Sequence, residues 1–310
     1  MGPSEIMGRA HLYKETNMTL RIAIITDIHH GKPSTAKRGD AALGLMEEFA
    51  RYVQDTGATH VLDMGDRISD ENQETDPRLA AEVAEAFRAV DVPIWHINGN
   101  HDRDHMTVAD NEKILGQNLG HAVLDLDGWR IVLWRADSRI RRGEEGHGFV
   151  LTEADLVWLS RTMQAADRPT LVVSHVPVSG HAQTGNYYFH NNPASATYPM
   201  DDRARAALAL AQVPVVCLAG HVHWNTVTTV DGITHLSQQS LTESFTTAGE
   251  PAGAMGVIEL ADTVAWEVVG DDPFNFTFRP TLRRWTPPLP DFSHHPELRH
   301  RHAAVPAKGV

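Results

Sequence analysis

The chain contains little that would place it outside a reducing compartment or in a membrane. Its 310 residues include a single cysteine, Cys217, which lies in an apolar run and has no partner for an intrachain disulfide. No apolar run approaches the roughly 20 residues that span a bilayer. The first residues also lack the basic start and apolar stretch of a signal peptide. We therefore expect a soluble, cytoplasmic protein.

The chain also has fewer basic than acidic residues. Lys and Arg number 27 against 40 Asp and Glu, which gives a formal net charge of -13. Affinity for a nucleic-acid backbone rests on exposed Lys and Arg, so this balance disfavours nucleic acid as the main partner. Histidine is abundant instead, with 19 copies.

The length suits one large α/β domain, which we place at residues 18–270. Residues 1–17 precede Met18 and the first predicted strand, so we interpret them as an N-terminal extension. Residues 271–310 become rich in Pro and His and have little capacity to form a core. We interpret them as a C-terminal tail that is either disordered or used for docking or an oligomer contact.

The apolar pattern alternates between strands and helices. Apolar runs at 20–25, 60–64 and 92–97 predict strands, and apolar positions spaced three and four apart predict helices over 39–55 and from Asp76 onward. This order predicts a largely parallel sheet covered by helices. Later, Asp127-Gly128 indicates a hairpin, and a helix is expected from Thr152 to about Gln164. After Thr226 the pattern favours antiparallel strands, so we expect a mixed second sheet. The segment 177–199 is too long for a mere connector and is our candidate for a pocket rim or lid.

Polar side chains follow five of the predicted strands, at the point where each strand ends. Because such loops carry the working groups of α/β proteins, these residues are candidates for a site. They are Asp27 and His29; Asp66; Asn100, His101 and Asp102; His175; and His221 with His223. Core histidines bonded to backbone groups, together with capping aspartates, are the alternative interpretation for any single member. That alternative does not account well for a pattern repeated five times.

The candidate ligands offer hard oxygen and imidazole donors and no thiolate, which suits Mn²⁺, Fe, Zn²⁺ or Co²⁺. They are Asp27, His29, Asp66, Asn100, His175, His221 and His223. Seven ligands are too many for one ion that must keep room for water, and about right for two ions that share a carboxylate. Two cations roughly 3.5–4 Å apart lower the pKa of a bridging water and stabilise both oxygens of an in-line displacement at phosphorus.

The order Asp-x-His, Gly-Asp, Gly-Asn-His-Asp, a lone His and Gly-His-x-His resembles the calcineurin-like metallophosphoesterases, from Asp27 to His223. The motif set is highly specific. The resemblance implies an α/β fold, a four-layer α/β/β/α sandwich of two mixed β-sheets flanked by helices, with two divalent metal ions at the strand ends. It places Asp27, His29, Asp66 and His223 on one ion and Asp66, Asn100, His175 and His221 on the other, with Asp66 bridging.

The resemblance also implies two residues beside the phosphate. His101 would stabilise the transition state or act as leaving-group acid, a contribution of roughly 10²–10⁴-fold, and Asp102 would orient its imidazole. The family often has another acid soon after Gly-Asp. Asp70 meets that place only loosely, so we leave it out of the predicted site.

Within the superfamily, the size and motifs are most similar to the bacterial class III cyclic-nucleotide and glycerophosphodiester phosphodiesterases. We therefore expect hydrolysis of a small phosphodiester by a metal-bridging hydroxide. A phosphomonoesterase comes second and a nuclease third. Candidate pocket contacts, each equally well explained as a loop or rim residue, are His30, Arg67, Tyr187, Tyr188, His190 and Asn191. By analogy with related enzymes, the strands after residue 226 and the tail would support a homo-oligomer.

Two alternative interpretations, each from another class of function, stay open. A binding or scaffold protein that kept the ligands without turnover would be expected to lack His101 or a ligand, and none is missing here. A mononuclear hydrolase of amides or lactones would leave Asn100 and several other ligands unexplained.

Overall fold

The computed structural model describes residues 19–142, 148–198 and 202–282. The predicted N-terminal extension and most of the predicted tail lie outside these residues. Among the helices of the described part, none is long and apolar enough to cross a membrane.

The first sheet contains six strands in the order β14-β13-β12-β1-β2-β3. Its parallel half confirms the predicted alternation and consists of β1 (Leu20–Ile25), β2 (His60–Asp63) and β3 (Ile94–His96). Its antiparallel half consists of β12 (Met255–Leu260), β13 (Val264–Val269) and β14 (Phe274–Phe278). The sheet thus continues past residue 270, so the predicted domain boundary is too early, and residues 274–278 are an edge strand rather than tail.

The second sheet has the order β10-β11-β9-β8-β5-β4. Its strands are β4 (Ala122–Leu126), β5 (Trp129–Leu133), β8 (Thr170–Val173), β9 (Val215–Ala219), β10 (Thr226–Val230) and β11 (Ile233–Ser237). The hairpin at Asp127-Gly128 is confirmed, and Asp231-Gly232 turns a second one. After Thr226 the expected antiparallel pairing is present between β10 and β11, and β11 also pairs in parallel with β9, so the second sheet is mixed as expected. A short separate pair joins β6 (Ile140–Arg141) and β7 (Gly148–Phe149).

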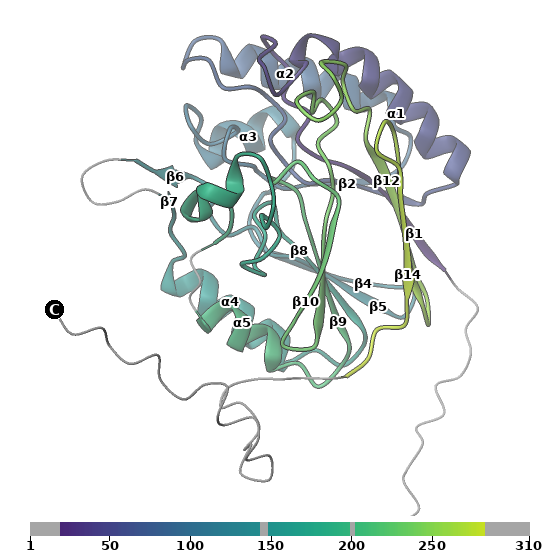
Figure 1. The fold of residues 1–310 in the computed structure, drawn as a ribbon. Coiled ribbons are helices and arrows are strands. Elements are labelled where there is room, and N and C mark those ends of the chain that lie inside the picture. Colours follow the sequence, from purple (N-terminus) through teal and green to yellow (C-terminus); the bar gives the residue numbers. More distant parts are fainter. Residues whose placement is uncertain (1–18, 143–147, 199–201, 283–310) are drawn as a thin grey trace, which may run out of the picture.

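Helices cover the outer faces of both sheets (Figure 1). On the first sheet lie α1 (Ala42–Thr56) and α2 (Asp76–Ala86), which pack with the strands in one apolar cluster. On the second lie α4 (Glu153–Gln164), capped by Thr152 as predicted, and α5 (Asp202–Ala209). The sequence prediction missed α3 (Val108–Leu115). Four short 3-10 helices complete the helices of the described residues: η1 (Gly39–Ala41), η2 (Phe87–Ala89), η3 (Phe189–Asn191) and η4 (Pro193–Ser195).

The two sheets pack face to face through the largest apolar cluster. Alternation along β1 shows how the sequence builds the layers: Ile22 and Ile24 enter the cluster between the sheets, whereas Ala23 and Ile25 enter the cluster under α1. The predicted four-layer α/β/β/α sandwich of two mixed sheets is therefore confirmed. Because β1 to β3 are mutually parallel, as are β8, β9 and β11, each set ends at one edge of its sheet, where the site lies.

Candidate metal centre

The seven predicted ligands meet at the carboxyl ends of five strands. Three of these strands belong to the first sheet and two to the second. We call them the metal cluster: Asp27, His29, Asp66, Asn100, His175, His221 and His223. All seven are buried. Their ligand atoms fall into groups no wider than 4.8 Å, among them Asp27 with His29 and His223, and Asp66 with His175 and His221. Asn100 Oδ1 joins the second group, 3.3 Å from His175 Nε2.

Backbone strain marks the same residues. Eight non-glycine residues of the described chain have positive φ, and five of them belong to the metal cluster: Asp27 (52°), His29 (48°), Asp66 (54°), His221 (69°) and His223 (60°). L-residues adopt this conformation at a cost of about 1–3 kcal/mol, and it persists where the surroundings impose it. Here it turns each side chain back over the strand end, and tight packing holds it, because a Cβ at Gly220 would overlap Thr26 and Asp27.

Hydrogen bonds at the outer edge of three imidazoles select their tautomers. The Nδ1–H of His175 donates to the Met64 carbonyl oxygen at 2.9 Å, and that of His29 faces the Ile68 carbonyl oxygen at 3.3 Å. The Nδ1–H of His223 donates to the Glu243 carboxylate at 3.0 Å. In each ring Nδ1 carries a proton, and Nε2 points into the cluster, where it can hold either a second proton or a metal ion.

The inward-facing atoms are imidazole nitrogens and carboxylate oxygens that need a cation, either a proton or a metal ion, between them. Nε2 of His29 and Nε2 of His223 lie 2.9 Å apart, and Asp27 Oδ1 lies 3.3 Å from His223 Nε2 with no hydrogen-bond partner of its own. Lone pairs this close repel each other unless a cation lies between them. The donor set, imidazole nitrogen and carboxylate oxygen without sulfur, is that of a divalent transition-metal ion.

Asp66 lies between the two groups of ligands. Its Oδ1 accepts the backbone N–H of His101 at 2.8 Å, while Oδ2 lies 3.8 Å from His29 Nε2 and 3.4 Å from His175 Nε2. Burial raises the pKa of Asp66, but the adjacent imidazoles of His175 and His101 outweigh it and hold that pKa well below its usual range. An ionised Oδ2 is therefore available to both groups at once.

The histidines differ in pKa according to their partners. Burial opposes protonation of all of them, and for His221, next to His175, it lowers the pKa to about 3. For His175, Asp66 overcomes burial and raises the pKa to about 9. For His223, the nearby carboxylates of Asp27 and Glu243 overcome burial and also raise the pKa to about 9. The cluster without metal therefore attracts positive charge at the atoms that are set out to bind ions.

His101 lies at the rim of the cluster, with its ring edge-on to that of His29 at a centroid distance of 4.8 Å. Its side chain is about one-quarter exposed, and Nε2 is 3.9 Å from Asp66 Oδ2. Nδ1 is hydrogen-bonded to the carboxylate of Asp70. Asp70 thus holds the imidazole at Nδ1, while Nε2 lies at the edge of the cluster, 3.3 Å from Lys37 Nζ.

Comparison with known proteins now places the chain. The family model for calcineurin-like phosphoesterases matches residues 20–225, more than half of the chain. The chain belongs to the calcineurin-like phosphoesterase family. The fold also matches the crystal structure of a dimetal phosphatase from Danio rerio, with 15% identity, 84% of this chain and 99% of that chain covered, and a TM-score of 0.66. A purple acid phosphatase from yellow lupin (Lupinus luteus) gives 12% identity, 84% and 54% coverage, and a TM-score of 0.58. Among curated proteins, none matches this chain.

This family is dinuclear and metal-dependent, and the metal cluster of this phosphoesterase fits that pattern: one group around Asp27, His29 and His223, one around His175 and His221, and Asp66 Oδ2 between them. The excess of inward-facing acceptors over donors is the observation that tests the fit.

Asp102 does not orient His101, contrary to our prediction. Its carboxylate accepts the backbone N–H groups of Asp66 (2.9 Å), Arg67 (3.0 Å) and Gly99 (2.8 Å), and it is fully buried. Asp102 thus holds together the loops that carry Asp66 and Asn100. Asp70, which we had left out, takes the place beside the imidazole.

Arg67 is also not a pocket residue. Its guanidinium is buried, donates to the Asp63 carboxylate at 2.9 Å and the Ile97 carbonyl oxygen at 2.8 Å, and pairs with Asp102 at 3.1 Å. His96 Nδ1 completes the group with a 2.8 Å contact to Asp63. We call Asp63, Arg67, His96 and Asp102 the arginine cluster.

The other predicted pocket residues lie at or near the rim. His30 is half-buried and held by Glu82, with Nε2 to carboxylate 2.7 Å. Tyr187 reaches the cluster, because its hydroxyl donates to Glu243, the partner of His223, at 3.3 Å. Tyr188, His190 and Asn191 are exposed on the segment 177–198, and the structure places none of them in contact with a metal-cluster residue.

The prediction missed two further residues that border the cluster. Glu243 follows β11, a sixth strand end at the same edge, and the run Gln238-Gln239-Ser240 before it was a signal of the kind used for the other five. Lys37, from the loop after β1, lies 3.3 Å from both His29 Nδ1 and His101 Nε2. Nothing in the pattern around Lys37 distinguishes it from a surface lysine.

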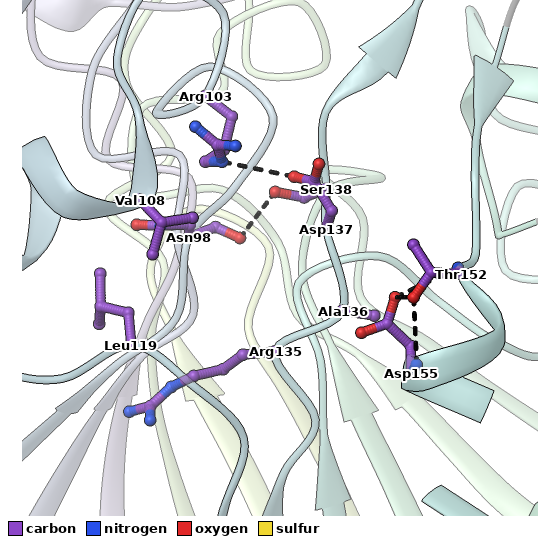
Figure 2. A pocket seen from close by; sticks show the side chains of 10 residues that line it. All are labelled: Asn98, Arg103, Val108, Leu119, Arg135, Ala136, Asp137, Ser138, Thr152 and Asp155. Atoms are coloured by element: carbon purple, nitrogen blue, oxygen red, sulfur yellow. Dashed lines mark hydrogen bonds and ion pairs between the residues drawn. The ribbon is translucent and has the colours of Figure 1, made fainter. Parts of the chain in front are cut away.

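A cavity of about 250 Å³ opens on another side of the loop that carries Asn98 and Arg103 (Figure 2). Several of its polar groups pair within the lining: Arg103 Nε lies 3.3 Å from Asp137, and the Ser138 hydroxyl donates to the Asn98 carbonyl oxygen at 3.0 Å. Arg135 bonds to groups outside it, such as the His96 carbonyl oxygen at 2.8 Å. The lining contains no member of the metal cluster. We therefore regard it as a junction between loops rather than as the site of the chemistry.

Proposed function

We propose that this phosphoesterase hydrolyses small phosphodiesters, of the cyclic-nucleotide or glycerophosphodiester type. The observation that carries the proposal is the combination of the metal cluster with the His101–Asp70 pair at its edge. When bound, two divalent ions activate a water and neutralise phosphate oxygens. The chain itself would supply the ligands, the bridging carboxylate of Asp66, and an acid for the leaving oxygen.

His101 is positioned for that acid role. Asp70 accepts the Nδ1–H of the ring, so the proton that would be transferred is the one on Nε2, which lies 3.9 Å from Asp66 Oδ2 at the edge of the metal cluster. An alkoxide is a poor leaving group, so its departure depends on receiving this proton. The amide oxygen of Asn100 is a neutral ligand, which lowers the negative charge that a phosphate must approach.

A diester carries a second organic group, and the rim offers a surface for one. The ring of Tyr187 stacks on that of Phe245 with a centroid distance of 4.0 Å and an interplanar angle of 25°. Both rings remain exposed, and Trp224 lies beside them, directly after His223 in the chain. An apolar or aromatic ester group would cover these faces. A monoester would leave them open to water on one side of the phosphate.

A phosphomonoesterase is the second candidate. Both solved structures named above are described as phosphatases, and this chain shares their fold. A fold hosts many specificities, so the choice between diester and monoester belongs to experiment.

The deciding experiment compares bis(p-nitrophenyl) phosphate with p-nitrophenyl phosphate, using protein stripped of metal and reloaded with Mn²⁺. We expect the diester to be hydrolysed with the higher kcat/KM. The Asp66→Ala variant, purified in parallel, serves as the blank for contaminating activities. Preference for the monoester would replace our proposal with the phosphatase alternative. Two bound ions without turnover of either ester would indicate a metal-binding protein that is not an enzyme.

A further inference from the structure

An ammonium group lies at the edge of the metal cluster. Lys37 Nζ is 3.3 Å from His101 Nε2, the nitrogen on the side of the ring toward Asp66. It is also 3.3 Å from Nδ1 of His29, on the edge of that ring opposite to the Nε2 atom that points into the cluster. The ammonium therefore lies beside the proposed position of the ions and not in it.

Backbone contacts hold Lys37 in this place. Lys37 pairs with Glu243 in an isolated antiparallel bridge, and the N–H of Arg38 donates to the Thr242 carbonyl oxygen at 2.8 Å. On the other side, the N–H of Ser244 donates to the Ala36 carbonyl oxygen at 3.0 Å. The loop after β1 is thus tied to the loop after β11, and the lysine is directed inward by a defined backbone rather than by a free surface loop.

No described carboxylate lies within ion-pair distance of the ammonium, and its two hydrogen-bond contacts are imidazole nitrogens. Burial lowers the pKa of Lys37, and the more distant carboxylates of Asp66, Asp70, Asp27 and Glu243 offset that effect only in part. His29 Nδ1 already faces the Ile68 carbonyl oxygen and carries the proton, so it cannot accept from Lys37. A half-buried cation next to a site for two divalent ions is unfavourable unless an anion joins them.

We propose that Lys37 binds a non-bridging phosphoryl oxygen of the substrate, beside the leaving oxygen that His101 serves. This inference rests on the proposed phosphoesterase function. The lysine would compensate the charge that develops on the phosphoryl oxygens without being a metal ligand. It would be a catalytic residue in the strict sense, since it contacts the reacting group.

The test measures binding of inorganic phosphate to Mn²⁺-loaded protein by calorimetry, with metal content determined in the same samples. Lys37→Met removes the charge and keeps the length of the side chain. We expect two ions per chain to be retained and phosphate affinity to fall roughly 10- to 100-fold, the loss expected for a charge-assisted hydrogen bond. Lys32→Met is the matched control: Lys32 lies on the same loop, its side chain is 81% exposed, and it pairs with Glu71.

Each other outcome overturns the inference. Equal phosphate affinity in Lys37→Met and wild type would show that the lysine does not touch the anion. Loss of an ion in Lys37→Met would assign the lysine to assembly of the metal centre. An equal loss in Lys32→Met would reduce the effect to the general charge of the loop. Since phosphate binding is read without turnover, an inactive wild-type protein would defeat the proposed function and leave this test intact.

Discussion

Two buried charged clusters lie side by side in this protein, and they are built on opposite principles. In the arginine cluster each acid meets a donor: Asp63 and Asp102 share the guanidinium of Arg67, and Asp102 also accepts backbone N–H groups. In the metal cluster acceptors face acceptors, as with Nε2 of His29 and His223, 2.9 Å apart. In the first, both carboxylates pair with a cation of the chain itself, and the Arg67 Nε–H is left without a hydrogen-bond partner. The second needs added cations, protons or metal ions, to separate its acceptors.

The contrast shows how a structural cluster differs from a functional one. Both are buried, both draw on the loops after β2 and β3, and both contain Asp and His. Burial of charge does not separate them. What separates them is whether donors balance acceptors, together with backbone strain: Asp27, His29 and Asp66 have positive φ, while Asp63, Arg67 and Asp102 do not.

The sharpest test of the comparison removes the residue that joins the ligand groups. Asp66→Ala takes away the oxygen that faces both groups, so we expect both ions to be lost. Turnover should fall by more than the roughly 10²–10³-fold that a single stabilising donor supplies. Metal analysis and kcat/KM on the nitrophenyl diester measure the two effects. Retention of both ions would show that Asp66 does not bridge.

A second test concerns His101 and the carboxylate that holds it, Asp70. His101→Ala should retain both ions and lose roughly 10²–10⁴-fold in kcat on an alkyl phosphodiester, with a much smaller loss on the nitrophenyl diester, whose leaving group needs no acid. Asp70→Asn should follow the same leaving-group dependence, since Asp70 holds the imidazole. Wild-type turnover of the alkyl diester by His101→Ala would remove the acid role.

Mutation of the arginine cluster should lower the stability of the fold rather than the rate of the reaction. Arg67→Met leaves Asp63 and Asp102 buried without their cation, so we expect a loss of about 3–5 kcal/mol in the free energy of unfolding. The urea midpoint measures it. Arg88→Met is the control, because Arg88 is exposed and its pair with Glu85 contributes about 0–1 kcal/mol. A normal midpoint with a raised KM would restore the predicted pocket role of Arg67.

The fold was predictable where the apolar pattern is strong. The parallel strands β1 to β3, the hairpin at Asp127-Gly128 and the cap at Thr152 follow from local sequence. The parallel pairing of β11 with β9 was not predictable in this way, because a hairpin strand carries no mark of its neighbour on the other side. The strand β14 was missed because its alternating pattern, Phe274 to Phe278, lies on a half-exposed edge.

The ligands were predictable for a chemical reason, and their surroundings were not. Each ligand directly follows an apolar strand, so sequence position alone brings it to the shared edge. Asp70, Lys37 and Glu243 reach the site through tertiary contacts with residues 20 to 206 positions away in the chain, such as Lys37 with His101 and Glu243 with His223. Asp102 and Arg67 also follow strand ends, as the ligands do, but they pair with each other instead of facing the metal cluster. Only the three-dimensional pairing of donors and acceptors reveals this difference.

The smallest effect is expected at Glu243, which is not a predicted ligand but holds the ligand His223 in place. Glu243 accepts the Nδ1–H of His223 at 3.0 Å and so keeps Nε2 free for an ion. Glu243→Gln keeps the size and one acceptor oxygen but removes the charge that makes the ring a stronger donor of its lone pair. We expect metal affinity to fall about 10- to 100-fold, which competition with a chelator measures.

Glu82→Gln is the matched control for this last prediction, because Glu82 also holds an imidazole, that of His30, at 2.7 Å, but His30 is not a member of the metal cluster. Its metal affinity should equal that of wild type. If both variants lost affinity equally, the charge of the whole rim, and not the tautomer of His223, would govern binding. If neither did, the convergence of lone pairs would be set by backbone geometry alone, and the positive φ of His223 would be sufficient to hold its ring in place.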